Sequence, residues 1–409
     1  MRLALAACTA AALTAGVAGC AAGGTQADGE AAAGKAHKAA AAVSNGKPLR
    51  LIGDGSTAYT GRQPDQPKFT RLKPGEKPPQ FVVYSWDGAG EDGSGLFQHF
   101  REVGKKYDAT MTFFLSGLYV LPESKRTEYT APGHAPGASD IGFLNDLHVK
   151  QTLEQVGAAW MDGHEIGTHF NGHFCGPTGV DSWSVEDWKS EISQAKRFVK
   201  SWKTTTGDRS SAPLPFDYDK ELTGARTPCL EGRKNLVKAA SELGWRYDTS
   251  GVNLQVWPKK GPEGLWDLSM QTVPFPGSKY EALTMDYNYK VNPNITPATA
   301  EAQVYRSLML GFDRSYAGNR APLIIGNHFE QWHGGAYMRA VENTIKSICP
   351  RPDVQCVSFR QLADWLDAQD PAVLAKLQQL QVGQQPGEGW QSYLTPAKPA
   401  TRERTPATA

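Results

Sequence analysis

The sequence has almost no excess of charge of either sign. Its 409 residues include 43 lysines and arginines and 42 aspartates and glutamates, which gives a formal net charge of +1. Proteins that bind nucleic acid through its phosphates carry a basic patch or stripe, and this balance does not indicate one. The composition, 40% hydrophobic and 21% charged, is that of a globular protein. We therefore expect a folded domain with no nucleic-acid partner.

Long hydrophobic runs are also absent. The alanine-rich run 3–18 is too short and too weakly hydrophobic for a transmembrane helix. It ends in Val-Ala-Gly-Cys at 17–20, which resembles the lipobox of bacterial lipoproteins. That resemblance implies a signal peptide over 1–20 and cleavage before a lipid-modified Cys20. The domain would then be anchored to the outer face of a bacterial cytoplasmic membrane, at the cell surface. The alternative is an ordinary secretory signal with a chance cysteine.

Cysteine is scarce, and two of the six cysteines lie in the first twenty residues. The other four are Cys175, Cys229, Cys349 and Cys356, and no Cys-x-x-Cys pair occurs, so we set aside a cysteine-rich metal site. An even number in an exported protein favours disulfides, and four cysteines allow three connectivities. The short local loop favours Cys349 with Cys356, which leaves Cys175 with Cys229.

Composition divides the rest of the chain into three parts. Residues 21–78 are rich in Ala, Gly, Lys and Pro, as in a flexible tether. Residues 371–409 are expected to form a C-terminal extension. Its last stretch, from roughly Gln384, carries Pro, Thr and charge with little to bury, so it is expected to be disordered or to form a strap over the surface. Residues 79–370 form the domain that lies between them.

The domain alternates β-like runs with helical periods. Predicted strands cover 81–84, 110–115, 223–226, 245–248, 323–327 and 354–357. Predicted helices carry apolar residues at 96–103, 153–160 and 359–365, and another begins at a capping box of Ser184 and Asp187. This alternation predicts an α/β fold with a parallel sheet inside and helices outside, either open or closed into a barrel. In a barrel, chemistry belongs at the carboxyl ends of the strands.

Residues that suit a metal ion follow two of these strands. His169 and His173 lie four positions apart in Gly-His-Glu-Ile-Gly-Thr-His-Phe-Asn-Gly-His at 163–173, so they can face one ion across a single turn. A bare His-x-x-x-His pair is weak evidence, but this one follows a probable strand and lies between glycines. Asp87, at the end of the first strand, is the candidate third ligand. An Asp-His-His site with open positions suits Lewis-acid hydrolysis.

The same segment resembles the second motif of the polysaccharide deacetylase family, the NodB-type carbohydrate esterases. Other segments match in the family's order: Ser-Trp-Asp-Gly at 85–88 with the first motif, Phe-Asp-Asp-Gly; Ala-Thr-Met-Thr-Phe-Phe at 109–114 with the second strand; Arg-Thr-Pro-Cys at 226–229 with the third motif; Gly-Trp-Arg-Tyr-Asp at 244–248, loosely, with the fourth; and Ile-Ile-Gly-Asn-His at 324–328 with the fifth. The likeness spans roughly residues 80–368.

The resemblance implies a distorted (β/α) barrel with parallel strands inside and helices outside. It also implies a divalent metal ion, most often zinc, held by Asp87, His169 and His173. The family's substrates are chitin oligomers, peptidoglycan and acetylated xylan, so a polysaccharide partner is expected.

Three further roles are implied by the same likeness. His328 would be the general acid that protonates the leaving amine or alkoxide. Arg226 would orient a carboxylate partner; the alternative is a purely structural ion pair. Asp248 would tune His328.

The first motif departs from the family's pattern. The family has two adjacent Asp residues, of which the first is the catalytic base and the second binds the metal, and here Trp86 stands in place of the first. Tryptophan cannot accept a proton from water, and a general base contributes about 10²–10⁴ in rate. We expect Asp92 to substitute for the base, with Glu91 in reserve. Cys229 also replaces an aromatic residue of the third motif, and its pairing with Cys175 would brace two loops of the site.

These observations favour a metal-dependent hydrolase that removes acetyl groups from a cell-wall or environmental polysaccharide. A non-catalytic carbohydrate-binding lipoprotein that retains the barrel is the alternative, because the usual base is missing. Hydrolysis of a non-sugar amide is a remoter one. Asp286, Trp332 and His333 are further candidates to line the substrate cleft.

Overall fold

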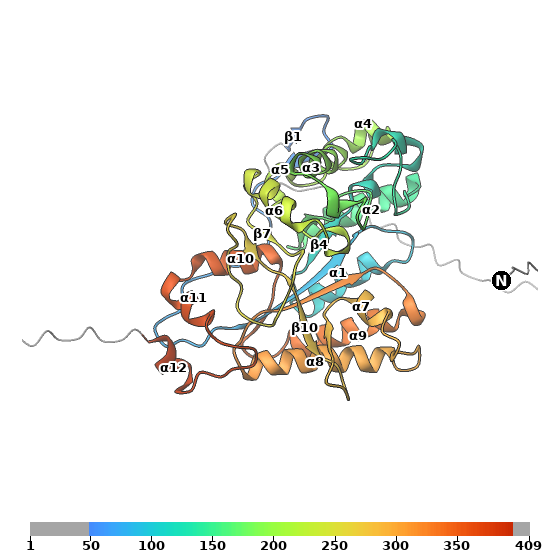
Figure 1. Ribbon diagram of the computed structural model, residues 1–409. Helices are drawn as coiled ribbons and strands as arrows, with labels where there is room; N and C mark the ends of the chain where they lie inside the picture. The colour runs from blue at the N-terminus through green and yellow to red at the C-terminus, as the bar shows by residue number, and fades with distance from the viewer. Residues whose placement is uncertain (1–48, 396–409) are drawn as a thin grey trace, which may run out of the picture. The chain divides into compact units, whose positions relative to one another are not determined.

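The computed structural model describes residues 49–395 (Figure 1). The predicted signal peptide and the predicted lipidation site, Cys20, lie outside these residues, as does the end of the predicted C-terminal extension. Among the helices of 49–395, none combines the length and the apolar character that a membrane crossing requires.

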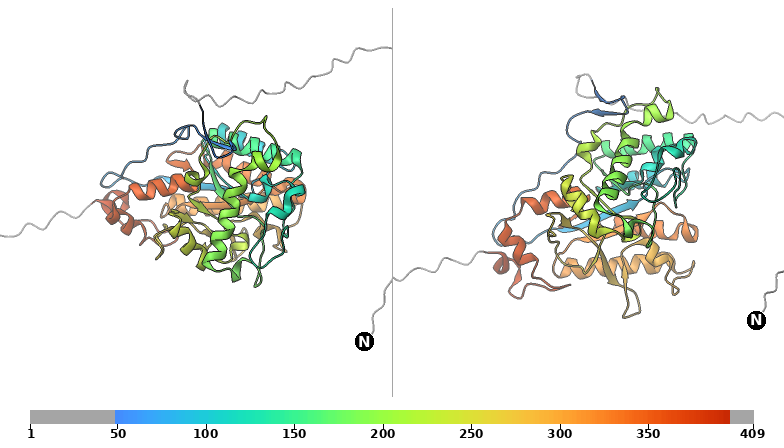
Figure 2. Two further views of the ribbon diagram at one scale, coloured as in Figure 1. Left: turned by 90° about the horizontal axis from the view of Figure 1, so that it is seen from above. Right: turned by 45° about the horizontal axis from the view of Figure 1, so that its top comes forward.

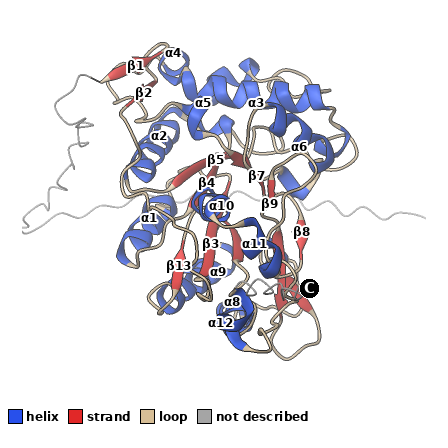
Figure 3. Ribbon diagram, turned by 90° about the vertical axis from the view of Figure 1, so that its left-hand side faces the viewer, coloured by secondary structure: helices blue, strands red, loops and turns tan. Residues whose placement is uncertain are grey.

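An eight-stranded parallel sheet forms the centre of the domain, with helices around it (Figure 3). Its strands follow the order β12-β3-β4-β5-β6-β7-β9, and β13 pairs with the first part of β3. The bounds are β3 (Gln80–Asp87), β4 (Thr112–Leu115), β5 (Glu165–Thr168), β6 (Gly224–Ala225), β7 (Tyr247–Asp248), β9 (Trp266–Asp267), β12 (Leu323–His328) and β13 (Val354–Cys356).

A smaller three-stranded sheet curls the large one toward closure. It consists of β8 (Val252–Asn253), β10 (Met270–Pro274) and β11 (Glu281–Leu283), in the order β11-β10-β8. The chain passes from β9 almost directly into β10, and beyond β11 the backbone of Met285 pairs with Gly326 of β12. The far edge of the large sheet is thereby connected back to its first strand. The result is the distorted (β/α) barrel that the sequence predicts.

The strand β3 is buried on both faces, as a central parallel strand should be. Its side chains alternate: Val82, Tyr84 and Trp86 belong to the core between the sheet and its helices, whereas Phe81 and Val83 belong to the other core, inside the barrel. Because successive side chains of a strand point to opposite faces, the positions after Val83 on the inner face are 85 and 87.

The helices cover the outside of the sheet. They are α1 (Leu96–Lys106), α2 (Asp146–Met161), α3 (Val185–Lys200), α4 (Trp202–Thr206), α5 (Tyr218–Glu221), α6 (Arg233–Glu242), α7 (Asp286–Lys290), α8 (Ala300–Ala317), α9 (Trp332–Ile348), α10 (Phe359–Ala368), α11 (Pro371–Leu377) and α12 (Gly389–Leu394). Short 3-10 turns cover η1 (Gly117–Val120), η2 (Glu123–Glu128), η3 (Val180–Ser182) and η4 (Pro228–Leu230). The long helices α8 and α9 pack side by side beneath the sheet (Figure 1).

The described part of the predicted tether, residues 49–78, is folded onto the domain. Residues 49–78 lie along the domain, where the short strands β1 (Arg50–Ile52) and β2 (Thr57–Tyr59) pair beside α4 (Figure 2). The indole of Trp202 donates to the carbonyl oxygen of Ser56 at 2.7 Å. Backbone and side-chain hydrogen bonds therefore fix a segment whose composition alone resembles a linker.

The predicted C-terminal extension is likewise folded over its described part. After α11, the chain continues to α12, and Leu377, Leu380 and Leu394 are buried against the core inside the barrel. These leucines pack residues 371–395 onto the domain, in agreement with the alternative of a strap that lies over the surface.

Candidate active site

The residues singled out in the sequence gather at the carboxyl edge of the sheet. Asp87 and His328 are the last residues of β3 and β12, and the two strands pair in a register that makes these residues direct neighbours. His169 follows β5, and Arg226 follows β6. Because parallel strands end at one edge, four separate segments bring their polar side chains together.

Asp87 is a buried carboxylate that is held in place by an arginine. The fully buried Arg226 donates from Nη1 to Asp87 Oδ1 at 2.7 Å and to Ser85 Oγ at 2.9 Å, while Nη2 donates to Thr249 Oγ1 at 3.1 Å. Burial alone would raise the pKa of Asp87, but the nearby charges of Arg226, His169 and His328 outweigh it and lower that pKa. Asp87 is therefore an ionised carboxylate, and it is the carboxylate partner predicted for Arg226.

His328 is paired with a different carboxylate from the one predicted. Asp286 Oδ1 lies 2.7 Å from His328 Nδ1, and Asp286 Oδ2 accepts the His328 backbone N–H at 2.7 Å. Burial opposes the charged form of the imidazole, but the Asp286 carboxylate outweighs burial and raises the pKa of His328 to about 9. The ring therefore carries a proton at neutral pH.

Asp248, the predicted partner of His328, lies elsewhere. It accepts from Arg233 Nε at 2.5 Å and from Ser250 Oγ at 2.6 Å. The strand order explains the error, because β7 is five places from β12 along the sheet. Asp286 follows β11, the strand that reaches β12 when the barrel closes.

The two metal-ligand candidates of the second motif differ in their surroundings. The Nδ1 atom of His169 lies 2.8 Å from the carbonyl oxygen of Arg226, and its Nε2 atom is buried without a hydrogen-bond partner among the described residues. Burial lowers the pKa of His169 to about 3, so the ring is neutral. His173 is half-buried, and its backbone has a φ of 56°. Burial also lowers its pKa.

The geometry of the histidine pair fits a divalent metal ion. The rings of His169 and His173 have their centroids 5.1 Å apart. Two imidazoles on one zinc ion, with Zn–N distances of about 2.1 Å, place their ring centres roughly that far apart. The buried, partnerless Nε2 of His169 is also what a ligand atom needs, since an unpaired buried nitrogen is costly. We conclude that this pair fits the metal that the sequence predicts.

Asp87 does not complete a three-ligand set with these histidines. Within residues 49–395, the set of three candidate ligands with atoms within 4.8 Å of one another is His173, Cys175 and Cys229, and Asp87 belongs to no such set. Those two cysteines form a disulfide, so they offer no thiolate. The carboxylate of Asp87 is engaged by Arg226 instead.

Trp86 does not face the site. Its ring is fully buried between the sheet and its helices. The ring centroid lies 4.2 Å from that of Phe100 and 5.1 Å from that of Phe329. The inner face after Ser85 is occupied by Asp87. Trp86 therefore points outward and directly precedes Asp87, whose carboxylate points inward. Gly88 follows Asp87.

The two predicted substitutes for the base serve the loop after β3. Asp92 is exposed, and its carboxylate accepts the backbone N–H of Ser94 at 2.9 Å. Glu91 is buried and accepts the backbone N–H of Gly95, at the start of α1, at 2.9 Å. In the described part of the chain, neither carboxylate bonds to Asp87 or to the histidines, so both stabilise the turn into α1.

A buried glutamate that sequence reasoning missed supports the turn between the two histidines. Glu191 of α3 accepts the backbone N–H of Asn171 at 3.0 Å and the hydroxyl of Tyr129 at 3.0 Å. The Tyr129 hydroxyl in turn accepts the backbone N–H of Gly172 at 3.0 Å. Burial raises the pKa of Glu191 to about 7. The only signal in the sequence is an acidic residue on the apolar side of a predicted helix.

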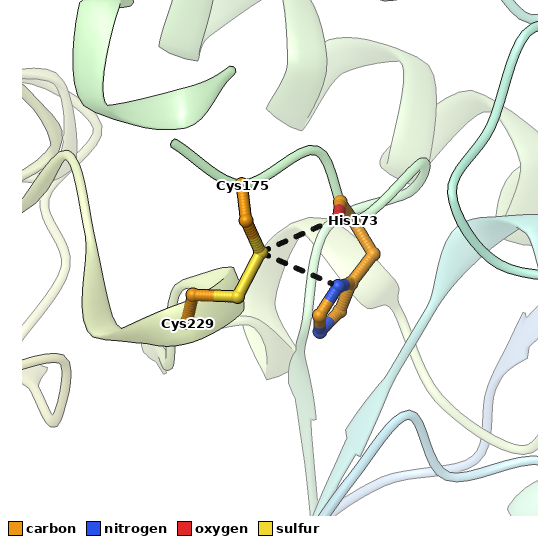
Figure 4. A group of neighbouring side chains, drawn as sticks. All are labelled: His173, Cys175 and Cys229. Atoms are coloured by element: carbon orange, nitrogen blue, oxygen red, sulfur yellow. Dashed lines mark hydrogen bonds between the residues drawn. A yellow bond between two sulfur atoms is a disulfide. The ribbon is translucent and has the colours of Figure 1, made fainter. Parts of the chain in front are cut away.

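Both predicted disulfides are confirmed. Cys349 pairs with Cys356, and Cys175 pairs with Cys229 across 54 positions of sequence. Figure 4 shows the second bridge beside His173, whose Nδ1 lies 3.8 Å from Cys175 Sγ. The bridge joins the loop of His173 to the turn that follows Arg226, as the sequence predicts.

Comparisons with known proteins give distant likenesses. No family model matches the chain, and no curated protein matches it. A proposed polysaccharide deacetylase from Mycobacterium smegmatis is similar at 14% identity, over 74% of this chain and 96% of that one, with a TM-score of 0.45. A family 4 carbohydrate esterase from Streptomyces lividans, in complex with acetate, is similar at 13% identity, over 68% and 91%, with a TM-score of 0.34. A CE4 family pseudoenzyme from Bacillus anthracis is similar at 13% identity, over 72% and 70%, with a TM-score of 0.37.

Proposed function

We propose that the chain is a polysaccharide deacetylase that hydrolyses acetyl groups from a cell-wall or environmental polysaccharide. The observation that carries this proposal is the pairing of an ionised carboxylate, Asp87, with a protonated imidazole, His328, on adjacent strands. Acyl hydrolysis needs one group that accepts a proton from the attacking water and one that gives a proton to the leaving group. The site holds both.

Asp87 is the proposed base. Arg226 binds one of its carboxylate oxygens and keeps the group ionised, which leaves the other oxygen to accept a proton from water. If the motif comparison is moved by one residue, Trp86 corresponds to the family's Phe, Asp87 to its first Asp and Gly88 to its second. The burial of Trp86 on the opposite face supports that alignment.

His328 is the proposed acid. Its Nδ1 is held by Asp286, so the other ring nitrogen is the atom that donates a proton to the leaving amine or alkoxide. Asp286 acts on the reaction through His328: it fixes the ring and raises its pKa.

His169 and His173 would hold a divalent metal ion, for which zinc is our proposal. When bound, such an ion supplies Lewis-acid polarisation of the acyl carbonyl. The chain's own contribution is to fix His169 through the Arg226 carbonyl oxygen and to keep its free nitrogen in a dry setting.

A non-catalytic carbohydrate-binding protein is the second candidate. It is favoured by one observation, that Asp87 forms no three-ligand set with the two histidines and is followed by Gly88, which offers no ligand atom in its side chain. A site with only two protein ligands would bind metal weakly, and a domain that has lost metal would retain at most binding.

We further propose that Cys20 carries a lipid that anchors the domain to the outer face of a bacterial membrane. The apolar run that ends at this cysteine supports the proposal. Cys20→Ser protein should leave the membrane fraction, whereas its persistence there would contradict a lipid anchor.

The test of the enzymatic proposal is acetate release from chitin oligomers, peptidoglycan and acetylated xylan by metal-loaded protein. Release that is reduced by His328→Gln supports the deacetylase. Glycan binding without release from any substrate would favour the binding protein.

A further inference from the structure

Two aromatic side chains lie directly beside the proposed acid. The ring centroid of Trp332 is 5.8 Å from that of His328, and the ring of Tyr287 is 6.0 Å from Trp332 at an interplanar angle of 66°. Tyr287 is 49% exposed, and Trp332 is half-buried. Tyr287 directly follows Asp286 on α7, and Trp332 lies four residues after His328, at the start of α9.

A lysine covers this aromatic pair. The Nζ of Lys290 lies 4.1 Å from the Trp332 ring centroid and 5.5 Å from that of Tyr287. Lys290 and Tyr287 are three residues apart on α7, so they share a face of that helix. Lys290 forms none of the ion pairs within residues 49–395, and an exposed cation–π contact contributes only about 0.5–1 kcal/mol. A carboxylate can therefore bind this ammonium group without breaking an existing ion pair.

Two carboxylates lie near Tyr119, a third aromatic residue of this surface. Burial, together with the negative charges of Glu330 and Asp92, raises the pKa of Tyr119 to about 12. Tyr119 lies against the loop after β3, where a side chain at Gly88 would meet its ring at 3.5 Å. An anionic ligand would therefore be repelled near Tyr119 and attracted by Lys290.

From this asymmetry we infer that the substrate carries a carboxylate on a sugar unit that packs on Trp332 and Tyr287, with the carboxylate bound by Lys290. This inference rests on the proposed function, since it assigns the substrate class of the same site. The flat rings accept the apolar face of a sugar, and the ammonium selects the acidic unit. A neutral sugar would leave Lys290 over the tryptophan and gain nothing from it.

The test compares matched acidic and neutral substrates. An acetylated uronic acid oligomer and an acetylated glycan whose sugars carry lactyl ether carboxylates are each used directly and after chemical reduction of the carboxyl to a hydroxymethyl group. We expect wild-type protein to show a KM roughly five-fold lower for the acidic form of at least one glycan, as an exposed ion pair allows. The form that shows this difference identifies the source of the carboxylate.

Two variants sharpen the comparison. Lys290→Gln should abolish the difference by raising KM for the acidic form alone, with kcat unchanged, and Lys290→Arg should preserve it. The difference should also shrink at high salt, because exposed charges are screened. Equal KM values for acidic and reduced substrates in wild type, or an unchanged preference in Lys290→Gln, would overturn the inference while the deacetylase proposal stands.

Equilibrium binding separates the two proposals if no acetate is released. Isothermal titration of wild type and Lys290→Gln with the same four glycans measures carboxylate preference without catalysis. A preference that depends on Lys290 supports the acidic subsite even if the domain proves non-catalytic. Its absence in binding overturns the inference independently of the chemistry.

Discussion

The two halves of the site differ in how completely the chain satisfies their polar atoms. In the half formed by β3 and β12, Asp87 is bound by Arg226, and His328 is bound by Asp286. In the half formed after β5, the Nε2 of His169 is buried and has no hydrogen-bond partner within residues 49–395, and His173 has a left-handed backbone. Protein groups satisfy the polar atoms of the first half, whereas the Nε2 atom of His169 in the second half needs a bound group. Under the proposed function, this comparison assigns proton transfer and metal binding to separate residues.

The largest expected effect comes from the histidine half. His169→Ala removes one of the two proposed metal ligands, so the affinity for the metal should fall. We expect bound metal below one tenth of the wild-type content, together with a loss of acetate release. Metal analysis of purified protein measures it. His99→Ala, which changes an exposed histidine paired with Glu342, is the matched control. Unchanged metal content in His169→Ala would move the metal site elsewhere.

The buried ion pair gives the next effect. Arg226→Met leaves the Asp87 carboxylate buried without its partner, which should destabilise the fold by about 3–5 kcal/mol. Urea unfolding measures the loss. Arg339→Met breaks an exposed pair with Glu301 and should cost less than about 1 kcal/mol. If the two variants lose equal stability, Asp87 is not the isolated buried charge described above.

The pH dependence of acetate release tests the same half of the site, with a smaller expected effect. The pKa of His328 is raised to about 9, so the proton it donates is present below that pH, and acetate release should fall as pH rises through about 9. The His328–Asp286 pair also contributes folding stability that is fully present below about pH 6.5 and is lost as pH rises through about 9.

Asp286→Asn removes the carboxylate that raises this pKa and leaves the burial that lowers it. The falling limb of the kcat/KM profile should therefore move to lower pH, to the ordinary histidine value of 6.5 or below it. A falling limb that stays near pH 9 in this variant would assign the limb to another group.

The smallest effect concerns the support of the histidine turn. Glu191→Ala leaves the backbone N–H of Asn171 and the Tyr129 hydroxyl without their acceptor, and groups that orient a metal ligand typically change metal affinity 10–100-fold. We expect the lower end of that range, since Glu191 acts on the backbone between the ligands. Glu191→Gln retains an acceptor oxygen and should remain close to wild type. Equal metal affinity in the alanine variant would make Glu191 a core residue only.

Much of this account was predictable from the sequence. The strand runs at 81–84 and 323–327 are apolar on both faces, and they form the centre of the barrel. Both disulfides followed from the number and spacing of the cysteines. The helix α8 (Ala300–Ala317), by contrast, was missed, because its buried face includes Ser307, Gly311 and Ser315, which interrupt the apolar stripe that indicates a helix in a sequence.

The errors at the site arise from what a linear motif cannot show. Alignment by the final Asp-Gly placed Trp86 in the position of a catalytic base, whereas strand alternation places it in the core between the sheet and its helices. A Trp86→Asp substitution would then bury a carboxylate against Phe100 and Phe329 instead of restoring a base. Asp286 was passed over as the partner of His328 because only closure of the barrel brings β11 beside β12.

The measurement that most directly tests the separation of the two halves is the metal content and turnover of Asp87→Asn. Because we assign Asp87 to proton transfer, the variant should retain the wild-type metal content, and acetate release should fall by about 10²–10⁴. Near-ultraviolet circular dichroism confirms that the protein compared is folded. Loss of metal to the level of His169→Ala would contradict the account, because it would make Asp87 a metal ligand.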